Sequence, residues 1–270
     1  MEISARRIVV IGAGHMGRAI IAGLREKALD VSIDIVEKSQ DRIRLIGDEF
    51  GIEPRPTYEP GQDDVVILAI QPQAFEEFSA AQPSGAFARS LVISVMAGVS
   101  IAAMENALNT VRVVRTIPNT PSEISQGMTV LCPGKAVTGG ETSLAEQIMS
   151  VIGRTVTVRN EALIDDATAL CGGGPAFVAY IAGAFIDFAM KAGFDPDQAR
   201  LMTAQVLRGT ADLMYGTGRD PEEMCRQVMT PGGTTEQGIF HYRDNGLHDL
   251  LVEGLNRSAN RSRELGRIGR

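Results

Sequence analysis

The stretch that most constrains the fold lies near the start of the chain, where a short β-branched run leads directly into a glycine-rich turn. Residues 7–12 read RIVVIG, and residues 12–17 read GAGHMG, which fits the pattern G-x-G-x-x-G. Apolar residues at helical spacing follow, among them Ala19, Ile20 and Leu24. A strand that enters a helix through such a turn is the context that dinucleotide binding requires. The chain is therefore predicted to begin with a strand–turn–helix unit of a dinucleotide-binding domain.

Each glycine of this turn has its own expected role. Gly12 permits the tight turn, Gly14 lets the backbone approach a pyrophosphate, and Gly17 allows the helix to pack closely on the strand. Amide N–H groups at the helix start face the anion. A glycine-rich turn without a ligand is the alternative. The predicted cofactor contacts of the turn are Gly12, Gly14, His15, Met16 and Gly17.

Glu37 stands at the end of the second predicted strand, about 20 residues beyond the turn. An acidic residue there typically accepts hydrogen bonds from the adenosine ribose and disfavours a 2′-phosphate. Lys38, Ser39 and Arg42 follow, and they would hold that phosphate if Glu37 turned away. A plain surface-charge role for Lys38 and Arg42 is the alternative. We predict a nicotinamide dinucleotide, NADPH or NADH, with Glu37 and Lys38 among its contacts.

Further apolar runs at residues 31–36, 64–70, 91–96 and 111–117 are predicted as strands, with helix-like segments between most of them. Near-continuous apolar strands of this kind indicate a parallel sheet with both faces covered. We therefore expect an α/β protein whose residues 1–160 form a doubly wound dinucleotide-binding domain of the Rossmann type.

Loops that follow the strands of such a sheet open onto its ligand crevice. The sequence AIQPQ follows the third predicted strand, and TIPNTP follows the fifth. Polar groups of Asn119 and Thr120 are candidates to face the nicotinamide, although simple turn formation explains the neighbouring prolines equally well. The cofactor contacts predicted from these loops are Ala69, Gln71, Pro72 and Asn119.

From about residue 164 onward the pattern changes to helices separated by glycine and proline. A long helix is expected to begin at Asp195 and Pro196 and to close on Gly216, and another to begin at Asp220 and Pro221. Residues 161–270 are predicted to form a helical domain. The run PAFVAYIAGAFIDFAM leaves little polar face, and a helix that is apolar nearly all round is normally buried. Dimerisation would cover it.

The sequence TPGGTTEQG, residues 230–238, lies between two of these predicted helices. A small anion needs N–H donors, and two consecutive glycines before a helix supply them with no side chain in the way. An ordinary connection between helices is the alternative. We predict an anion-binding turn here.

Composition excludes several classes of protein. A net charge of −7 argues against a nucleic-acid binder, and a solvated helix face explains the arginines between residues 257 and 270. Three scattered cysteines and three histidines without ligand-like neighbours predict no metal site and a reducing compartment. The longest apolar run, residues 176–186, is too short to suggest a membrane span, and no signal-peptide pattern begins the chain. We expect a cytoplasmic protein without membrane contact.

Taken in order, the motifs resemble those of the pyrroline-5-carboxylate reductase family. They run from VVIGAGHMGRAI through VVILAIQPQ, SVMAGVSI, VRTIPNTP and GGGPAF to TPGGTTEQG and the closing NRSREL, and so cover nearly the whole chain. The family reduces L-1-pyrroline-5-carboxylate to L-proline with NAD(P)H, the last step of this amino-acid biosynthesis. Its members pair through intertwined helical carboxy-terminal domains. The resemblance implies an oxidoreductase that forms a homodimer or a higher oligomer of dimers.

The resemblance also implies a substrate site. By the family's pattern, the segment that matches residues 230–235 binds the substrate carboxylate through backbone N–H groups, and Thr235 places its hydroxyl near the imine nitrogen. Thr235 is thus the implied catalytic residue. The implied substrate contacts are Thr230, Gly232, Gly233, Thr234 and Thr235.

This chain departs from the family's pattern at three places. Gln71 stands where the family usually has lysine, Met96 where a small alanine is usual, and residues 172–177 lack two usual hydroxyls. Two alternatives therefore stay open: a reductase of another cyclic imine acid, such as piperideine carboxylate, and a non-catalytic nucleotide-binding regulator. A β-hydroxyacid-type dehydrogenase would need a lysine base early in the helical domain, and Lys191 is expected to face solvent.

Overall fold

The computed structural model describes residues 7–27, 31–59, 61 and 63–268. Its backbone divides into two compact units. Unit 1 comprises Met1–Gly173 together with Asn256–Arg270, and unit 2 comprises Gly174–Leu255. Residues 161–173, which were predicted to begin the helical domain, therefore pack with unit 1.

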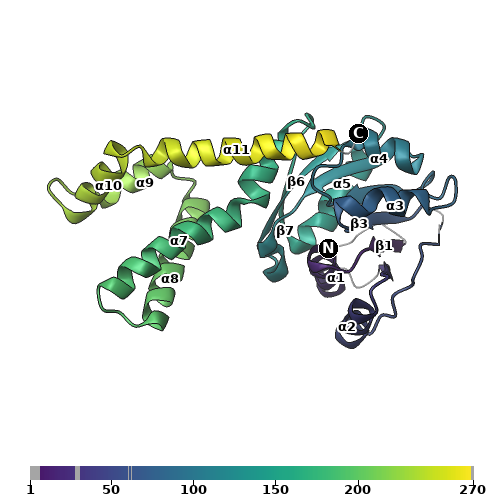
Figure 1. Ribbon diagram of the computed structural model, residues 1–270, viewed down its shortest axis with the longest axis horizontal. Coiled ribbons are helices and arrows are strands. Elements are labelled where there is room, and N and C mark those ends of the chain that lie inside the picture. The colour runs from purple at the N-terminus through teal and green to yellow at the C-terminus, as the bar shows by residue number, and fades with distance from the viewer. Residues whose placement is uncertain (1–6, 28–30, 60, 62, 269–270) are drawn as a thin grey trace. The chain divides into compact units, whose positions relative to one another are not determined.

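Unit 1 is built on a seven-stranded sheet with the order β2-β1-β3-β4-β5-β6-β7. All neighbouring strands are parallel except β5 and β6, which are antiparallel. Figure 1 shows the strands side by side in this unit. Their bounds are β1 Arg7–Ile11, β2 Ser32–Val36, β3 Val65–Leu68, β4 Leu91–Ser94, β5 Val113–Ile117, β6 Gly127–Pro133 and β7 Gly153–Thr157.

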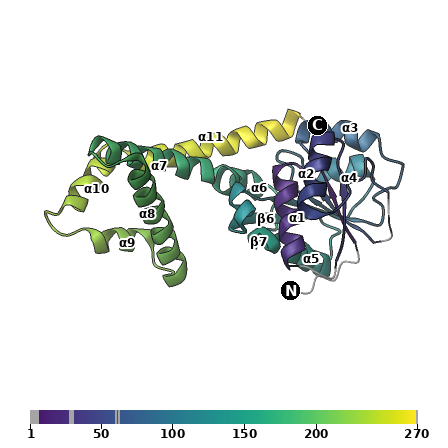
Figure 2. The same cartoon turned by 90° about the horizontal axis from the view of Figure 1, so that it is seen from below.

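Helices cover both faces of this sheet, as the two cartoon views show (Figures 1 and 2). One face packs against α1 (His15–Lys27), α2 (Gln40–Phe50) and α5 (Gly139–Met149). The other face packs against α3 (Phe75–Ala80), α4 (Ile101–Leu108) and α6 (Leu163–Ala167). Alternate strand residues such as Val113 and Val114 enter opposite cores, because successive side chains of a strand point to opposite faces. The predicted doubly wound α/β arrangement is confirmed.

The five strands predicted from apolar runs are all present, each within two residues of the predicted start. The sequence prediction missed β6 and β7, and β6 makes the sheet mixed where a parallel one was expected. β7 lies at the edge of the sheet and its residues are half-buried or exposed, so it carries no continuous apolar run for a pattern to detect. The described residues of this unit also form short helical turns: η1 Pro72–Ala74, η2 Thr120–Ile124, η3 Ser150–Ile152 and η4 Thr168–Gly172.

Unit 2 is helical. Its elements are α7 Gly174–Lys191, α8 Pro196–Thr217, α9 Pro221–Val228, α10 Thr234–Asp244 and the first part of α11 Leu247–Ile268, whose residues from Asn256 onward belong to unit 1. α7 and α8 contact each other and form a helical hairpin, which Figure 1 shows.

The predicted helix starts in unit 2 are confirmed at atomic detail. The Asp195 side chain accepts hydrogen bonds from the backbone at the start of α8, and Asp220 does the same for α9. α8 ends at Thr217, with Gly218 in the left-handed conformation at φ 63°, rather than at Gly216 as predicted. Gly218 takes this role because a left-handed C-cap carries no steric cost for glycine.

Unit 2 leaves much of its apolar surface uncovered within a single chain. Tyr180 on α7 is 87% exposed and Phe188 is 74% exposed, and Leu201 on α8 is 70% exposed. The helical stretch Leu163–Lys191 is long and apolar enough to cross a membrane by length and composition, and 6% of its most apolar window is buried. The sequence prediction of no span counted only an uninterrupted apolar run, and so it missed this stretch.

Candidate functional site

The glycine-rich turn between β1 and α1 has the geometry that its sequence predicts. Gly12 has φ +95°, and a Cβ there would lie 2.7 Å from the carbonyl oxygen of Ala69. A Cβ at Gly17 would overlap the carbonyl oxygen of Gly12, so helix and turn touch backbone to backbone. A Cβ at Gly14 would meet no heavy atom within 4 Å. The turn is therefore tight on its protein side and open at Gly14, where a pyrophosphate needs room.

This turn lies where the strand order of the sheet reverses. β1 is flanked by β2 on one side and β3 on the other, and in a sheet of order 2-1-3-4-5 ligands bind at this reversal. The Ala69 N–H donates to the carbonyl oxygen of Ile11 at 2.8 Å, so the segment after β3 borders the turn. Gln71 is exposed and Pro72 begins η1. The structure thus brings the first and third predicted loops together.

The Glu37 side chain is turned inward. It is 6% exposed, and its carboxylate accepts the backbone N–H groups of Ala13 at 2.9 Å, Lys38 at 2.8 Å and Ser39 at 2.9 Å. The Arg42 Nε lies 3.0 Å from the same carboxylate. Burial raises the pKa of Glu37, but these backbone hydrogen bonds and Arg42 outweigh it and leave the pKa below its usual value. Glu37 therefore ties the glycine-rich turn to the start of α2.

The basic residues after Glu37 face outward. Lys38 is 67% exposed and lies 3.6 Å from Glu77, and Arg42 is 49% exposed. Ser39 is the N-cap residue of α2, and its hydroxyl makes no capping hydrogen bond. Glu37 thus turns inward, as in the alternative considered from the sequence, but Arg42 pairs with its carboxylate and Lys38 lies beside Glu77, so a phosphate contact of either stays a prediction. The direct ribose contact of Glu37 stays a prediction.

The Asn119 side chain is used inside unit 1. Its Nδ2 donates to the carbonyl oxygen of Cys171 at 3.1 Å, and its Oδ1 accepts the Met128 N–H at 2.8 Å. These bonds fix the turn between β5 and β6, and a cofactor contact of Asn119 stays a prediction. The His15 ring pairs with Glu123 of η2 and is 60% exposed.

In unit 2, residues 230–235 form a closed turn at the start of α10. The Gly233 N–H donates to the carbonyl oxygen of Thr230 at 2.8 Å, and Gly232 has φ +71°. A Cβ at Gly233 would overlap the Thr230 hydroxyl, so the turn needs glycine there. The Gly232 N–H donates to Oε2 of Glu236 at 2.7 Å.

Gly233 is the N-cap residue of α10, and Thr234 and Thr235 are its first two helical residues. Thr235 is therefore not the cap of this helix. Thr235 is half-buried and Thr234 is exposed. Since the first N–H groups of a helix lack intrahelical partners and glycine offers no capping side chain, an external anion can take them.

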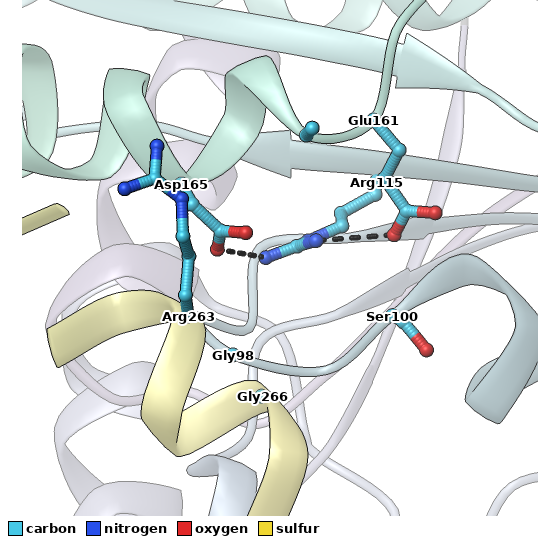
Figure 3. A pocket seen from close by; sticks show the side chains of 8 residues that line it. Gly98, Ser100, Arg115, Glu161, Asp165, Arg263 and Gly266 are labelled. Carbon is cyan, nitrogen blue, oxygen red and sulfur yellow. Dashed lines mark hydrogen bonds and ion pairs between the residues drawn. The ribbon is translucent and has the colours of Figure 1, made fainter. Parts of the chain in front are cut away.

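Sequence reasoning missed a charged network inside unit 1. Arg115 of β5 is 5% exposed, and it lies 3.0 Å from Glu161 and 3.2 Å from Asp165. Figure 3 shows its guanidinium between these two carboxylates. The Ser262 hydroxyl of α11 donates to Asp165 at 2.8 Å. A charged residue in the middle of the apolar run VRVVRTI was the available signal.

A cavity of about 270 Å³ adjoins this network. It is lined by Gly98, Ser100, Arg115, Glu161, Ala162, Asp165, Arg263 and Gly266. Arg263, one of the terminal arginines for which a solvated helix face was predicted, is 37% exposed and pairs with Asp166. A Cβ at Gly266 would lie 3.2 Å from the Gly98 carbonyl oxygen, which shows how closely α11 approaches the loop after β4. The network therefore fixes the end of α11 to unit 1.

The glycine-rich turn at the strand reversal of a doubly wound sheet is typical of a dinucleotide-binding domain. Residues 7–98 match the family described as NADP oxidoreductase, coenzyme F420-dependent. Residues 161–265 match the family described as pyrroline-5-carboxylate reductase dimerisation. The chain thus carries a dimerisation domain, which contains the long apolar stretch Leu163–Lys191.

Full-length relatives identify the family. A pyrroline-5-carboxylate reductase of Pseudomonas aeruginosa is 33% identical over 97% of this chain and 98% of the relative. One of Schizosaccharomyces pombe is 30% identical over 96% of this chain and 98% of the relative. The solved structure of a pyrroline-5-carboxylate reductase from Coxiella burnetii has a TM-score of 0.86 and 30% identity over 97% of this chain and 98% of that one. The chain belongs to the pyrroline-5-carboxylate reductase family.

Proposed function

We propose that this chain reduces L-1-pyrroline-5-carboxylate to L-proline with NAD(P)H. The observation that carries the proposal is that the family relationship extends over 97% of the chain and so includes both the glycine-rich turn of unit 1 and the turn before α10 in unit 2. An enzyme that transfers a hydride from a dinucleotide cofactor to a small acid needs a binding turn for each of the two molecules. The reaction is the last step of proline biosynthesis.

The residues present fit a nicotinamide dinucleotide. The open space at Gly14 and the N–H groups at the start of α1 would hold the pyrophosphate, and Ala69, Gln71 and Pro72 would border it. Lys38 and Ser39 would lie near the adenosine ribose. Glu37 would shape this part of the site by fixing the glycine-rich turn. When bound, the reduced cofactor supplies a hydride to the imine carbon. The protein's part is to bind, orient and exclude water.

The turn before α10 would hold the substrate. Thr230, Gly232, Gly233 and Thr234 offer backbone groups to the substrate carboxylate, and Thr235 would place its hydroxyl near the imine nitrogen. A cyclic imine can arrive already protonated, so these motifs need no strong general acid. Holding the ring by its carboxylate brings the imine carbon into one orientation, and such positioning accounts for a large part of enzymatic acceleration.

Assembly and location complete the proposal. The exposed apolar residues of α7 and α8 would pack against a second copy of this chain, giving a homodimer or an oligomer of dimers that works in the cytoplasm. Residues 1–160 would act as the dinucleotide-binding domain and residues 161–270 as the domain for substrate binding and dimerisation. The partner copy, rather than a lipid bilayer, would cover the apolar stretch.

Steady-state assays test this function directly. The purified chain is mixed with pyrroline-5-carboxylate and either NADPH or NADH, and oxidation of the cofactor is followed by absorbance. Proline must appear in the same amount as the cofactor consumed. Piperideine carboxylate serves as the comparison substrate, and a kcat/KM that is higher for it would reassign the enzyme to that ring size. Cofactor binding without oxidation on either imine would overturn the proposal.

A further inference from the structure

The turn that would hold the substrate carboxylate already contacts a carboxylate of the protein itself. Glu236 is the third residue of α10, and its Oε2 accepts the Gly232 N–H at 2.7 Å. An acid at this helix position commonly reaches back to the N–H of the N-cap residue. Here it reaches one residue further, because Gly233 is the N-cap residue. The Glu236 carboxylate therefore occupies the Gly232 N–H, which is one of the hydrogen-bond donors of the proposed substrate turn.

The turn does not depend on this contact for its shape. The bond from the Gly233 N–H to the Thr230 carbonyl oxygen closes it at 2.8 Å without Glu236. The close approach of Gly233 to the Thr230 side chain restricts it further. Glu236 can therefore leave the Gly232 N–H while the turn keeps its conformation.

A substrate carboxylate and the Glu236 carboxylate have the same chemistry. Both are anionic acceptors, and each backbone N–H is a single donor that one of them at a time can engage with good geometry. Two carboxylates at neighbouring N–H groups of one turn also repel each other. Binding of an anionic ring through the Gly232 N–H therefore has to displace Glu236.

We propose that Glu236 is an internal competitor of the substrate carboxylate and thereby sets the KM for the imine acid. In the free enzyme it satisfies the Gly232 N–H, and it withdraws when the substrate binds. The inference rests on the proposed function, because it takes residues 230–235 as the site of the substrate carboxylate. Glu236 would act on capture and not on the chemical step, so it is a residue that determines affinity.

The substitution Glu236→Gln separates competition from simple support of the turn. Glutamine keeps the length of the side chain and a carbonyl acceptor, but it loses the charge. If Glu236 competes, the KM for the imine falls by about three- to tenfold while kcat stays within about twofold, since a charge-assisted hydrogen bond no longer has to be broken. The inhibition constant of acetate against the imine falls in the same proportion. If Glu236 only supports the turn, the KM rises or stays as it is.

A matched control removes one negative charge from the same helix. Asp244 is the last residue of α10 and is exposed, so Asp244→Asn tests a general effect of charge on an anionic substrate. We expect the KM to be unchanged in this variant. An equal fall of KM in both variants would overturn the competition. Melting temperatures of both proteins establish that the comparison is between folded enzymes.

A second measurement keeps the inference testable apart from turnover. The amide resonance of Gly232 is followed by nuclear magnetic resonance while acetate is added to the wild type and to Glu236→Gln. Acetate should shift this resonance at a lower concentration in the variant. Equal titrations would overturn the inference even where both proteins reduce the imine. Failure of the wild type to reduce any cyclic imine would instead overturn the proposed function, and the acetate titration would still report on Glu236.

Discussion

The two units of this chain bury their apolar residues in opposite ways. Unit 1 covers both faces of its sheet with its own helices, and large side chains such as Phe87, Ile20 and Leu68 are almost completely buried. In unit 2 the buried hydrophobic residues are Ala189 and Ala199 among those that the structure describes, while large residues of α7 and α8 are exposed. Unit 1 is a finished domain, whereas unit 2 needs a partner surface.

This difference divides the work of the enzyme. The turn of unit 1 is suited to tight binding of a cofactor, because backbone contacts fix Gly12, Gly17 and Glu37 within the same chain. The turn before α10 stands in the unit that matches the dimerisation family and exposes apolar residues of α7 and α8. Substrate capture should therefore depend on assembly, and cofactor binding should depend on it much less.

The largest expected effect comes from breaking the association. Tyr180→Glu combined with Phe188→Glu places two carboxylates on the exposed face of α7. A dissociation constant of about 1 μM corresponds to a binding free energy of about 8 kcal/mol. Burying two unpaired carboxylates in the interface costs a large part of that free energy. We expect a monomer by light scattering that no longer reduces the imine.

Val111→Glu is the matched control in unit 1, because Val111 is 60% exposed in a unit that is already complete. It should leave the mass, the activity and NADPH binding as they are. A wild-type protein that is monomeric at micromolar concentration, or a double variant that stays associated, would remove the distinction between the two units.

The second effect concerns the stability of unit 1. Arg115→Met leaves Glu161 and Asp165 without the buried charge between them. Removing one partner of a fully buried ion pair lowers the free energy of unfolding by about 3–5 kcal/mol, but Glu161 is 32% and Asp165 17% exposed, so we expect a loss of about 2–3 kcal/mol. Denaturant unfolding measures the loss. Adding Glu161→Gln and Asp165→Asn to the same chain should recover a large part of the lost free energy of unfolding. An unchanged stability of Arg115→Met would mean that the network does not stabilise unit 1.

The sequence predicted unit 1 well because its signals are local. A run of β-branched residues, three glycines at fixed spacing and helical periodicity specify β1, the turn and α1 without knowledge of the rest of the chain. The Asp195 and Asp220 helix starts were predictable for the same reason. The Arg115 network depends on partners more than 40 residues away along the chain, such as Asp165 and Ser262, and no local pattern contains them.

The site was predictable as a set of segments and less so as a set of side-chain roles. The sequence placed Glu37 at the end of β2, but it could not show that the carboxylate points back at Ala13. Likewise the sequence placed Asn119 after β5, but it could not show that the side-chain oxygen of Asn119 accepts the Met128 N–H. Such choices depend on which buried N–H groups lack partners, and that is known only once the fold is known.

The third effect separates chemistry from capture within unit 2. Thr235→Ala removes a hydroxyl that would contact the imine nitrogen, so kcat should fall by about ten- to a hundredfold, or about 1–3 kcal/mol. Gly233→Val obstructs the turn beside Thr230 and should mainly raise the KM for the imine.

The dissociation constant of NADPH should stay the same in both variants, because the cofactor belongs to unit 1. Thr235→Ser keeps the hydroxyl and should keep kcat near that of the wild type. A normal kcat in Thr235→Ala, together with a lower melting temperature, would show that Thr235 has only a structural role.

The smallest effect distinguishes two neighbouring residues of unit 1. Lys38 is exposed beside the N-cap of α2, so Lys38→Ala should raise the KM for NADPH by about fivefold through loss of a surface charge, worth about 1 kcal/mol, and leave NADH unchanged. Glu37→Gln should weaken both cofactors equally, because the inward carboxylate holds the Ala13 N–H of the turn that both share. The measurement is the KM of each variant for NADPH and for NADH.

If Glu37→Gln lowered the KM for NADPH relative to that for NADH, the carboxylate would face the ribose in the working enzyme and would discriminate against the 2′-phosphate. If instead Lys38→Ala left the ratio of the KM for NADPH to the KM for NADH unaltered, Lys38 and Arg42 would be surface charges without a role in cofactor choice. That choice would then have to come from the loop after β3, where Gln71 stands in place of the lysine that is usual in the family.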